Sequence, residues 1–345
     1  MRKERLKGEL TLSNSKRIYW LFRCTEKKYA NSFCTKGTIK LNTPRTWVQH
    51  AKDVGLGRGD LLEGAFCSYA IKDIQSFLKF RNLRNNLESE FQNGLTYLRS
   101  ANVIDLPTFC LYGLYDSSFK ERYFNETKRW AKVSYVKIDY FRDFYKYESR
   151  EAINLLKEEE QPVFIIIKSP NEFFRRILKF FESIGISNKE ILIKPVDYID
   201  KQQPYLFRGP APYELFIKDK RFINQSELRI VLNTQNNKVL KGLEEDNFII
   251  NIGDLSDITE IHPYYLEDML IEYDNMTLRF NLSEPIVTKF EDMTVEELMK
   301  LRFQLVKGYY DNISSDEQQK AIEDVDRIFK EKFNLYHHYI DDIEY

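Results

Sequence analysis

The residues with the clearest capacity for chemistry are Gln225, Ser226 and Glu227, at the point where a loop is expected to become a strand. Leu, Ile and Leu occupy alternate positions of residues 228–232, which is typical of a strand with one face mostly buried. Because alternate residues of a strand share a face, we expect Gln225 and Glu227 to bind one ligand together, as the candidate catalytic pair. Arg229 is counted with the binding residues, and the structural alternative is an ion pair of Glu227 with Arg229 or with a neighbouring lysine on a solvent face.

A carboxylate beside a bound sugar can stabilise the oxocarbenium-like state through which a glycosidic bond breaks, provided that water is excluded. The second group of interest is Arg23, at the end of a strand expected at residues 17–23. A guanidinium can hold a pyrophosphate through two parallel hydrogen bonds. The two groups predict one sugar-sized hollow between Arg23 and Glu227, whereas the structural alternative for Arg23 is a salt bridge that covers the strand end.

The elements at the front of the chain are expected to form the floor of this cleft. A helix is predicted to begin after Thr25, its N-cap, and to end at Gly37, and a short strand follows at residues 38–41. Residues 54–64 contain four glycines, either as a flexible surface loop or as backbone that approaches a ligand closely. Their spacing matches neither common phosphate-binding fingerprint. His50, shortly before this segment, is the one histidine placed to line a site.

The rest of the chain changes between strand and helix patterns, so the predicted fold class is α+β: a mixed, partly split β-sheet flanked by helices. Two amphipathic helices predict a C-terminal helical appendage for packing or oligomerisation. The expected domains are a flexible N-terminus at 1–16, an α+β core at 17–284 and the appendage at 285–345. Further strands are expected at 65–71, 106–115, 163–167, 190–199, 248–252, 268–273 and 276–280, and helices at 74–99, after Ser169 and Pro170, at 213–217, 293–306 and 315–333.

The composition excludes several classes of protein. The 345 residues include 52 basic and 53 acidic side chains, so no global field attracts nucleic acid or anionic lipid. The four cysteines are too scattered for a zinc knuckle or a CxxC redox pair, and we expect them to be reduced in a cytoplasmic protein. No apolar run has the length of a signal peptide or of a membrane span of about 20 residues, so no membrane association is expected.

Four segments carry a resemblance, in this order: residues 18–47 with KGTIKLNTPRTW, residues 59–64 with the pattern Gly-Asp-x-x-Glu-Gly, residues 164–174, FIIIKSPNEFF, and residues 216–232, FIKDKRFINQSELRIVL. Together they resemble a large group of bacterial proteins known only as a domain of unknown function. In that group a strand, an N-P-x-x-F-type helix start and a K-D-x-x-F-x-x-Q-x-E-x-R-I segment recur. The resemblance covers roughly residues 17–275 and implies no established activity.

The order of these elements is also similar to the layout of ADP-ribosyltransferases. It consists of an arginine at the end of a first strand, then a helix, a second strand and, much later, a Gln-x-Glu strand. That resemblance implies that Arg23 holds the ribose or pyrophosphate of NAD. It further implies that Glu227 holds a ribose hydroxyl and stabilises the ribosyl cation, while Gln225 orients the acceptor. Many members carry Ser-Thr-Ser on a central strand to support the nicotinamide, and Ser68 and Tyr69 are the nearest substitute here.

The function expected from these residues is that of an ADP-ribosyltransferase-like enzyme with NAD as its substrate and no metal. A protein, a nucleic acid or water would accept the ADP-ribose, and a toxin or antiviral defence role would suit the bacterial setting. Two alternatives stay open. One is a non-enzymatic sensor or partner-binding protein that uses the helical tail and the Tyr-rich segment 117–147 as its interface. The other is a metal-dependent nuclease, for which Asp60, Glu63 and Glu227 would have to converge.

Overall fold

A computed structural model describes residues 17–54, 59–70, 86–124, 129–142, 145, 147, 149–264, 266, 268–273, 277–279, 323 and 326–327. The chain divides into two compact units, residues 1–120 with 132–281 and residues 121–131 with 282–345. Of the second unit, the described part comprises segments 121–124 and 129–131 and three helical residues at 323, 326 and 327. The predicted N-terminus at 1–16 lies outside the described residues, as do the rest of the predicted helices at 293–306 and 315–333.

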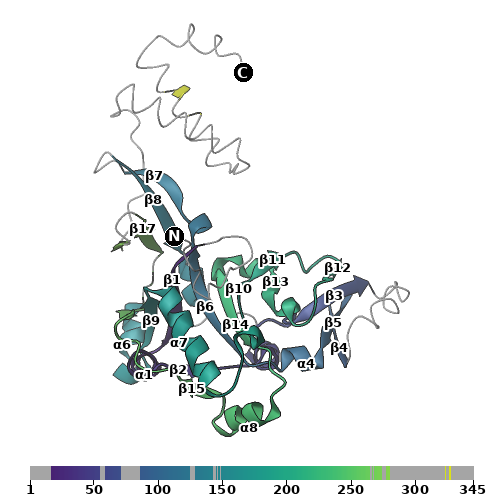
Figure 1. The fold of residues 1–345 in the computed structure, drawn as a ribbon. Coiled ribbons are helices and arrows are strands. Elements are labelled where there is room, and N and C mark those ends of the chain that lie inside the picture. The colour runs from purple at the N-terminus through teal and green to yellow at the C-terminus, as the bar shows by residue number, and fades with distance from the viewer. Residues whose placement is uncertain are drawn as a thin grey trace, which may run out of the picture. The chain divides into compact units, whose positions relative to one another are not determined.

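The largest element of the first unit is a six-stranded sheet in which every neighbouring pair of strands is antiparallel (Figure 1). Its strand order mixes segments that are far apart in the sequence, so the middle of the sheet joins the front of the chain to the Gln-x-Glu segment. In spatial order the strands are β10 (Ile191–Pro195), β14 (Glu227–Leu232), β6 (Thr108–Tyr115), β1 (Ile18–Glu26), β9 (Pro162–Ile167) and β16 (Thr259–Pro263).

Both faces of this sheet are covered. The unbroken apolar run of β9 is buried at all six positions, as predicted for a strand with neighbours on both faces. On one face, α1 and α7 pack apolar side chains such as Phe33, Phe173 and Phe181 against the sheet. Full burial of such a side chain stabilises the fold by about 1.5–3 kcal/mol. The other face packs Phe22, Tyr112 and other aromatic residues in a second apolar cluster.

The helices follow local sequence signals. Gly37 ends α1, as predicted: its φ of +61° is the left-handed conformation that glycine tolerates, and its backbone N–H donates to the carbonyls of Phe33 and Ser32. The N-cap of α1 is Glu26 rather than the predicted Thr25, which belongs to β1. Pro170 occupies the first position of α7, as predicted. The α-helices are α1 (Lys27–Lys36), α2 (Pro44–Val54), α4 (Ala101–Ile104), α5 (Ile138–Arg142), α6 (Arg150–Asn154), α7 (Pro170–Ser183) and α8 (Asn237–Glu245).

Smaller sheets surround the central one. One has the order β12-β3-β5-β4, with β12 (Tyr205–Leu206), β3 (Ala65–Ala70), β5 (Leu95–Ser100) and β4 (Leu87–Gln92). Two pairs are β15 (Ile249–Asn251) with β2 (Thr38–Lys40), and β11 (Asp197–Ile199) with β13 (Ile217–Asp219). A fourth sheet contains β18 (Thr277–Arg279), β17 (Met269–Glu272), β8 (Arg129–Val136) and β7 (Lys120–Phe124). Short 3-10 helices lie at Asp116–Ser118, Glu158–Glu160, Asn188–Glu190, Tyr213–Phe216 and Lys220–Gln225.

The helix predicted at 74–99 is wrong in its second half, where β4 and β5 form an antiparallel hairpin. The turn is Asn93-Gly94, with φ of +52° and +78°, the dipeptide that favours a tight hairpin because both residues tolerate positive φ. Residues 87–100 therefore form two paired strands joined by this turn, although the spacing of charged residues favoured a helix. Residues 71–85 lie outside the described residues.

The predicted α+β class is confirmed: the described chain mixes helices with several antiparallel sheets. The strand predicted at 190–199 is interrupted at Val196, so that β10 joins the central sheet and β11 pairs with β13. The strands predicted at 268–273 and 276–280 pair as β17 and β18, although residues 274–276 lie outside the described residues. Within the described residues, no helix is long and apolar enough to cross a membrane.

Candidate functional site

The central sheet splits between β1 and β6. These strands pair up to Phe22 and Tyr112, and beyond that point β1 continues along β9 while β6 continues along β14. The backbone of residues 23–26 therefore separates from that of residues 108–111. This divergence confirms a partly split sheet and opens a gap in its middle.

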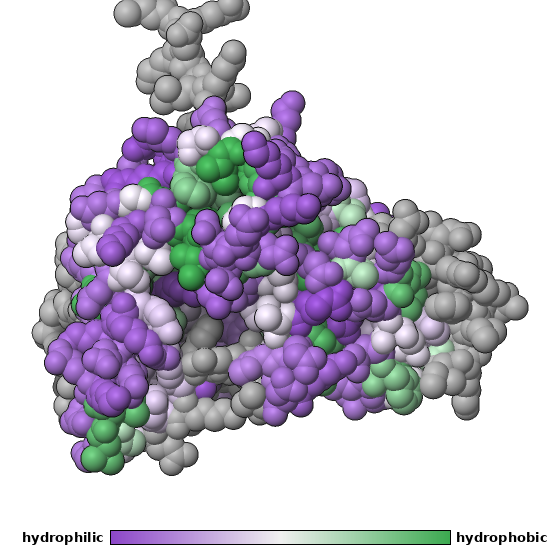
Figure 2. Space-filling model, turned by 90° about the horizontal axis from the view of Figure 1, so that it is seen from below, coloured by the Kyte–Doolittle hydropathy of each residue, from purple (hydrophilic) through white to green (hydrophobic). Residues whose placement is uncertain are grey.

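A cavity with a volume of about 690 Å³ lies at this split. Its walls come from β1, α1, β2, α2, β6, β13, β14 and the segment that precedes β3. The molecule seen from below is hollowed near its centre, and the residues around the hollow are mostly hydrophilic (Figure 2). The polar and charged residues among those that line the cavity include Arg23, Glu26, Lys40, Asn42, His50, Asp60, Glu63, Lys218, Gln225 and Glu227.

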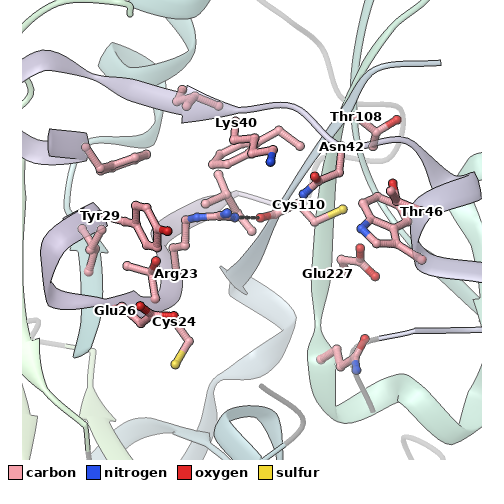
Figure 3. A pocket seen from close by; sticks show the side chains of 18 of the residues that line it. Arg23, Cys24, Glu26, Tyr29, Lys40, Asn42, Thr46, Thr108, Cys110 and Glu227 are labelled. Carbon is pink, nitrogen blue, oxygen red and sulfur yellow. Dashed lines mark hydrogen bonds between the residues drawn. The ribbon is translucent and has the colours of Figure 1, made fainter. Parts of the chain in front are cut away.

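Arg23 spans part of the split. Its Nη1 donates a hydrogen bond of 3.0 Å to the backbone carbonyl of Cys110, and its guanidinium lies 4.4 Å from the centre of the Phe109 ring (Figure 3). Among the described residues no carboxylate lies within ion-pairing distance of Arg23, so the predicted alternative of a salt bridge is not observed there. Burial lowers the pKa of the Arg23 guanidinium. An anion bound in the cavity would offset the free-energy cost of burying the charged guanidinium.

Glu227 lies in the same cavity but in a different electrostatic setting. Its carboxylate accepts hydrogen bonds from Lys218 at 2.9 Å and from Arg229 at 3.0 and 3.1 Å. Burial alone would raise the pKa of Glu227, but the charges of Arg229 and Lys218 hold it well below its ordinary range. The two cations therefore favour the ionised form of the Glu227 carboxyl group and balance its negative charge.

The structure corrects the role predicted for Arg229, which is fully buried and does not line the cavity. Its guanidinium forms a bidentate pair with Glu63, at 2.5 and 3.1 Å, as well as the contacts to Glu227. The Trp47 ring covers it, with its centre 5.3 Å from the guanidinium carbon. The predicted alternative, a pair between Glu227 and Arg229, is therefore the observed one, although it is buried rather than on a solvent face.

Gln225 lines the cavity beside Glu227, but strand alternation is not the reason. Gln225 ends a 3-10 helix, and Ser226 adopts a left-handed conformation with φ +40° before the strand begins. Lys218 joins the two residues, since its ammonium donates to Gln225 at 2.6 Å and to Glu227. Burial alone would lower the pKa of Lys218, but the charges of Glu227 and Glu63 raise it.

Arg23 and Glu227 line the same cavity although the register places them on opposite faces of the sheet. Glu227 lies opposite Tyr112, which lies opposite Phe22, so these three side chains share one face of the sheet. Arg23 follows Phe22 and belongs to the other face. Both nevertheless line one cavity, and Figure 3 shows them on either side of Cys110.

The remaining predicted residues divide into two groups. His50 lines the cavity from α2, as expected. Ser68 and Tyr69 do not line it, which corrects their predicted role: they lie in β3 of the smaller sheet. There Ser68 donates a hydrogen bond to the carbonyl of Gln203 and accepts one from the N–H of Tyr205.

The Gly-Asp-x-x-Glu-Gly segment supplies two lining residues. A Cβ at Gly59 would lie 2.4 Å from the carbonyl oxygen of Trp47, so this glycine is required by close packing on α2. The packing fixes Asp60 and Glu63, which are both buried and both line the cavity. Glycine therefore serves a helix contact at this position, while residues 55–58 lie outside the described chain.

The acidic residues of the site do not form a metal centre. Both carboxylate oxygens of Glu63 are bound by Arg229, and those of Glu227 by Lys218 and Arg229. Among the described residues no group of three His, Cys, Asp or Glu side chains could hold a metal ion. Glu63 and Glu227 thus act as partners of buried cations.

Lys218 was not among the predicted site residues, although a neighbouring lysine was one of the partners expected for Glu227. Its signal was position: Lys218 belongs to the short strand β13, where every residue is buried. A buried lysine requires an anionic partner, and Glu227 is the nearest acid on the following strand.

No family model, no curated protein and no solved structure matches this chain.

Proposed function

We propose that the protein binds an anionic ligand of the nucleotide class in the cavity at the split of the central sheet. The observation that carries this proposal is the guanidinium of Arg23, which lines that cavity and forms an ion pair with no carboxylate of the described residues. Within the described residues, two buried carboxylates near the other wall, Glu63 and Glu227, are already paired with the cations Lys218 and Arg229. The positive charge of Arg23 is therefore left for a ligand.

A second cation supports the same placement of charge. Lys40 of β2 lines the cavity, is exposed, and has no carboxylate within ion-pairing distance among the described residues. The acid at this side of the cavity, Glu26, is paired with Lys28 at 2.7 Å. A phosphate between Arg23 and Lys40 would receive charge-assisted hydrogen bonds from both, and Arg geometry suits such a group.

Aromatic side chains support a ring-containing ligand. Tyr29 of α1 lines the cavity with 56% of its surface exposed, and Trp47 lines it from α2. Exposed aromatic faces stack on nucleobases of any sequence. A volume of about 690 Å³ falls within the range of small-molecule and cofactor sites. NAD, ADP-ribose and ADP are members of this class, with a base, a ribose and a pyrophosphate.

Calorimetric titration of the full chain with NAD, ADP-ribose, ADP and inorganic pyrophosphate tests the proposal. We expect Arg23→Gln to weaken nucleotide binding at least about tenfold, because a charged hydrogen bond is lost. Arg23→Lys keeps the positive charge but cannot form two parallel hydrogen bonds, so its affinity for nucleotides should lie between those of the wild type and Arg23→Gln. The matched control is Arg175→Gln, on the outer side of α7, where the side chain is 62% exposed. Binding that is absent for every ligand, or equal in Arg23→Gln, would contradict the proposal.

A second candidate function is the cleavage of NAD, by ADP-ribosyl transfer or hydrolysis, at the same site. The specific observation in its favour is that Glu227, an ionised carboxylate, lines the cavity that contains Arg23. A fixed anion beside the ribose would stabilise the developing cation, although its pairing with Lys218 and Arg229 weakens that field. Without cleavage, the same site would make the protein a nucleotide sensor.

The release of nicotinamide from NAD separates these two forms. An enzyme should lose turnover in Glu227→Gln, with circular dichroism as the control for folding, whereas a sensor releases no nicotinamide in any variant. If transfer to a protein or nucleic acid occurs, Gln225→Ala should reduce transfer more than hydrolysis, since Gln225 would orient the acceptor. If nicotinamide release is unchanged in Glu227→Gln, Glu227 does not have the role in cleavage that is proposed for it.

A further inference from the structure

One carboxyl group that lines the cavity has an oxygen to which no described residue donates a hydrogen bond. Asp60 is 2% exposed and lines the cavity. Its Oδ1 accepts a hydrogen bond of 2.9 Å from the N–H of Leu62, which fixes the orientation of the carboxyl group. Its Oδ2 accepts no hydrogen bond from the described residues. Buried polar atoms in folded proteins are nearly always satisfied, so this oxygen requires a partner.

The charged groups around Asp60 are engaged elsewhere. The ammonium of Lys201 donates to the carbonyl of Leu62 at 3.0 Å, and Lys218 donates to the Gln-x-Glu pair. Glu63 is held by the buried arginine of β14. Among the described residues, none of these groups forms an ion pair with Asp60. The partner is therefore expected to enter through the cavity.

We infer that Asp60 binds a sugar hydroxyl of the ligand, so that the ligand is a ribonucleotide with its phosphate at Arg23. This inference rests on the proposed nucleotide site. A hydroxyl both donates and accepts, so it pairs with Oδ2 whether or not the carboxyl group carries a proton. An ammonium group would require the ionised form, yet burial and the charge of Glu63 raise the pKa of Asp60 and disfavour that form.

The first arm of the test uses the unmodified chain. ADP and 2′,3′-dideoxy-ADP carry the same base and pyrophosphate and differ only in the sugar hydroxyls. We expect ADP to bind about tenfold or more tightly than the dideoxy compound, because the latter leaves the buried oxygen of Asp60 unsatisfied. Equal affinities that both depend on Arg23 would overturn this inference and leave the nucleotide site standing. The absence of binding by either compound and by NAD would instead overturn the nucleotide site.

The second arm assigns the hydroxyl contact to one residue. Asp60→Ala should reduce the preference for ADP to less than about threefold, while Asp60→Asn, which can still pair with a hydroxyl, should keep part of it. The control is Asp105→Ala, an exposed acid outside the cavity that pairs with Arg45. Thermal unfolding confirms that each variant is folded. A full preference for ADP in a folded Asp60→Ala protein would overturn the assignment.

Discussion

Replacement of Arg229 by methionine tests the conclusion that this residue is a buried structural cation rather than a ligand-binding group. Arg229 has no exposed surface and holds Glu63 and Glu227 together through four hydrogen bonds. Methionine has a similar length, so the change removes charge and donors more than volume. It leaves Glu63 without a cation within ion-pairing distance among the described residues, while Glu227 retains Lys218.

The expected magnitude follows from the two carboxylates that remain. Removal of one partner from a buried ion pair destabilises a protein by about 3–5 kcal/mol, because a buried charge is left uncompensated. Since Arg229 serves two carboxylates, we expect Arg229→Met to lower the free energy of unfolding by at least about 3 kcal/mol. The corresponding control, Arg175→Met on the exposed face of α7, should lower it by less than about 1 kcal/mol.

Urea denaturation at pH 7 measures these differences. A second substitution, Glu63→Gln, tests whether the charges of Glu63 and Arg229 stabilise each other. In the wild-type background, Glu63→Gln should destabilise the protein, because Arg229 loses a charged partner. In the Arg229→Met background the same substitution should stabilise it, because it removes an isolated buried charge. If Glu63→Gln has the same effect in both backgrounds, or if Arg229→Met changes the stability by less than about 1 kcal/mol, the ion network does not stabilise the fold as argued.

Three further outcomes follow from the geometry. Because burial raises the pKa of Asp60, its ionisation opposes folding above that pKa; Asp60→Asn should therefore raise the melting temperature at pH 7, with a smaller gain as the pH falls and the wild-type group protonates. Gly37→Ala should destabilise the protein by more than about 1 kcal/mol, since φ is +61° and backbone lies 2.3 Å from the added Cβ, whereas Gly185→Ala, with φ +86° in open space, should have a smaller effect in the same denaturation assay. Tyr29→Ala should weaken the binding of ADP and leave that of inorganic pyrophosphate unchanged, which a calorimetric titration with both compounds would reveal.

Much of the fold could be predicted because its signals are local. The apolar run of β9, the proline that opens α7 and the glycine that ends α1 are each explained by their neighbours in the sequence. The hairpin of β4 and β5 also has a local signal, the turn dipeptide Asn93-Gly94. The charged pattern of residues 74–99 favoured a helix instead, although this dipeptide already indicated a hairpin.

The candidate site was predictable only in part. Of the predicted site residues, Arg23, Gln225, Glu227 and His50 line the cavity, whereas Ser68, Tyr69 and Arg229 do not. Alternation wrongly suggested a solvent-facing side chain at Arg229, because pattern alone cannot show that a second layer covers the polar face of a strand. The covering residue, Trp47, is distant in sequence.

The sequence by itself determined many of the strands, the end of α1, the start of α7 and the residue types that could hold a phosphate and a sugar, because hydrophobic period and backbone preferences act over a few residues. Only the tertiary structure decided which of those residues share a cavity. The register of β1, β6 and β14 puts Arg23 and Glu227 on opposite faces, and it is the separation of β1 from β6 that lets both line one hollow. Strand separation depends on long-range pairing with β9 and β14, which no local stretch of sequence specifies.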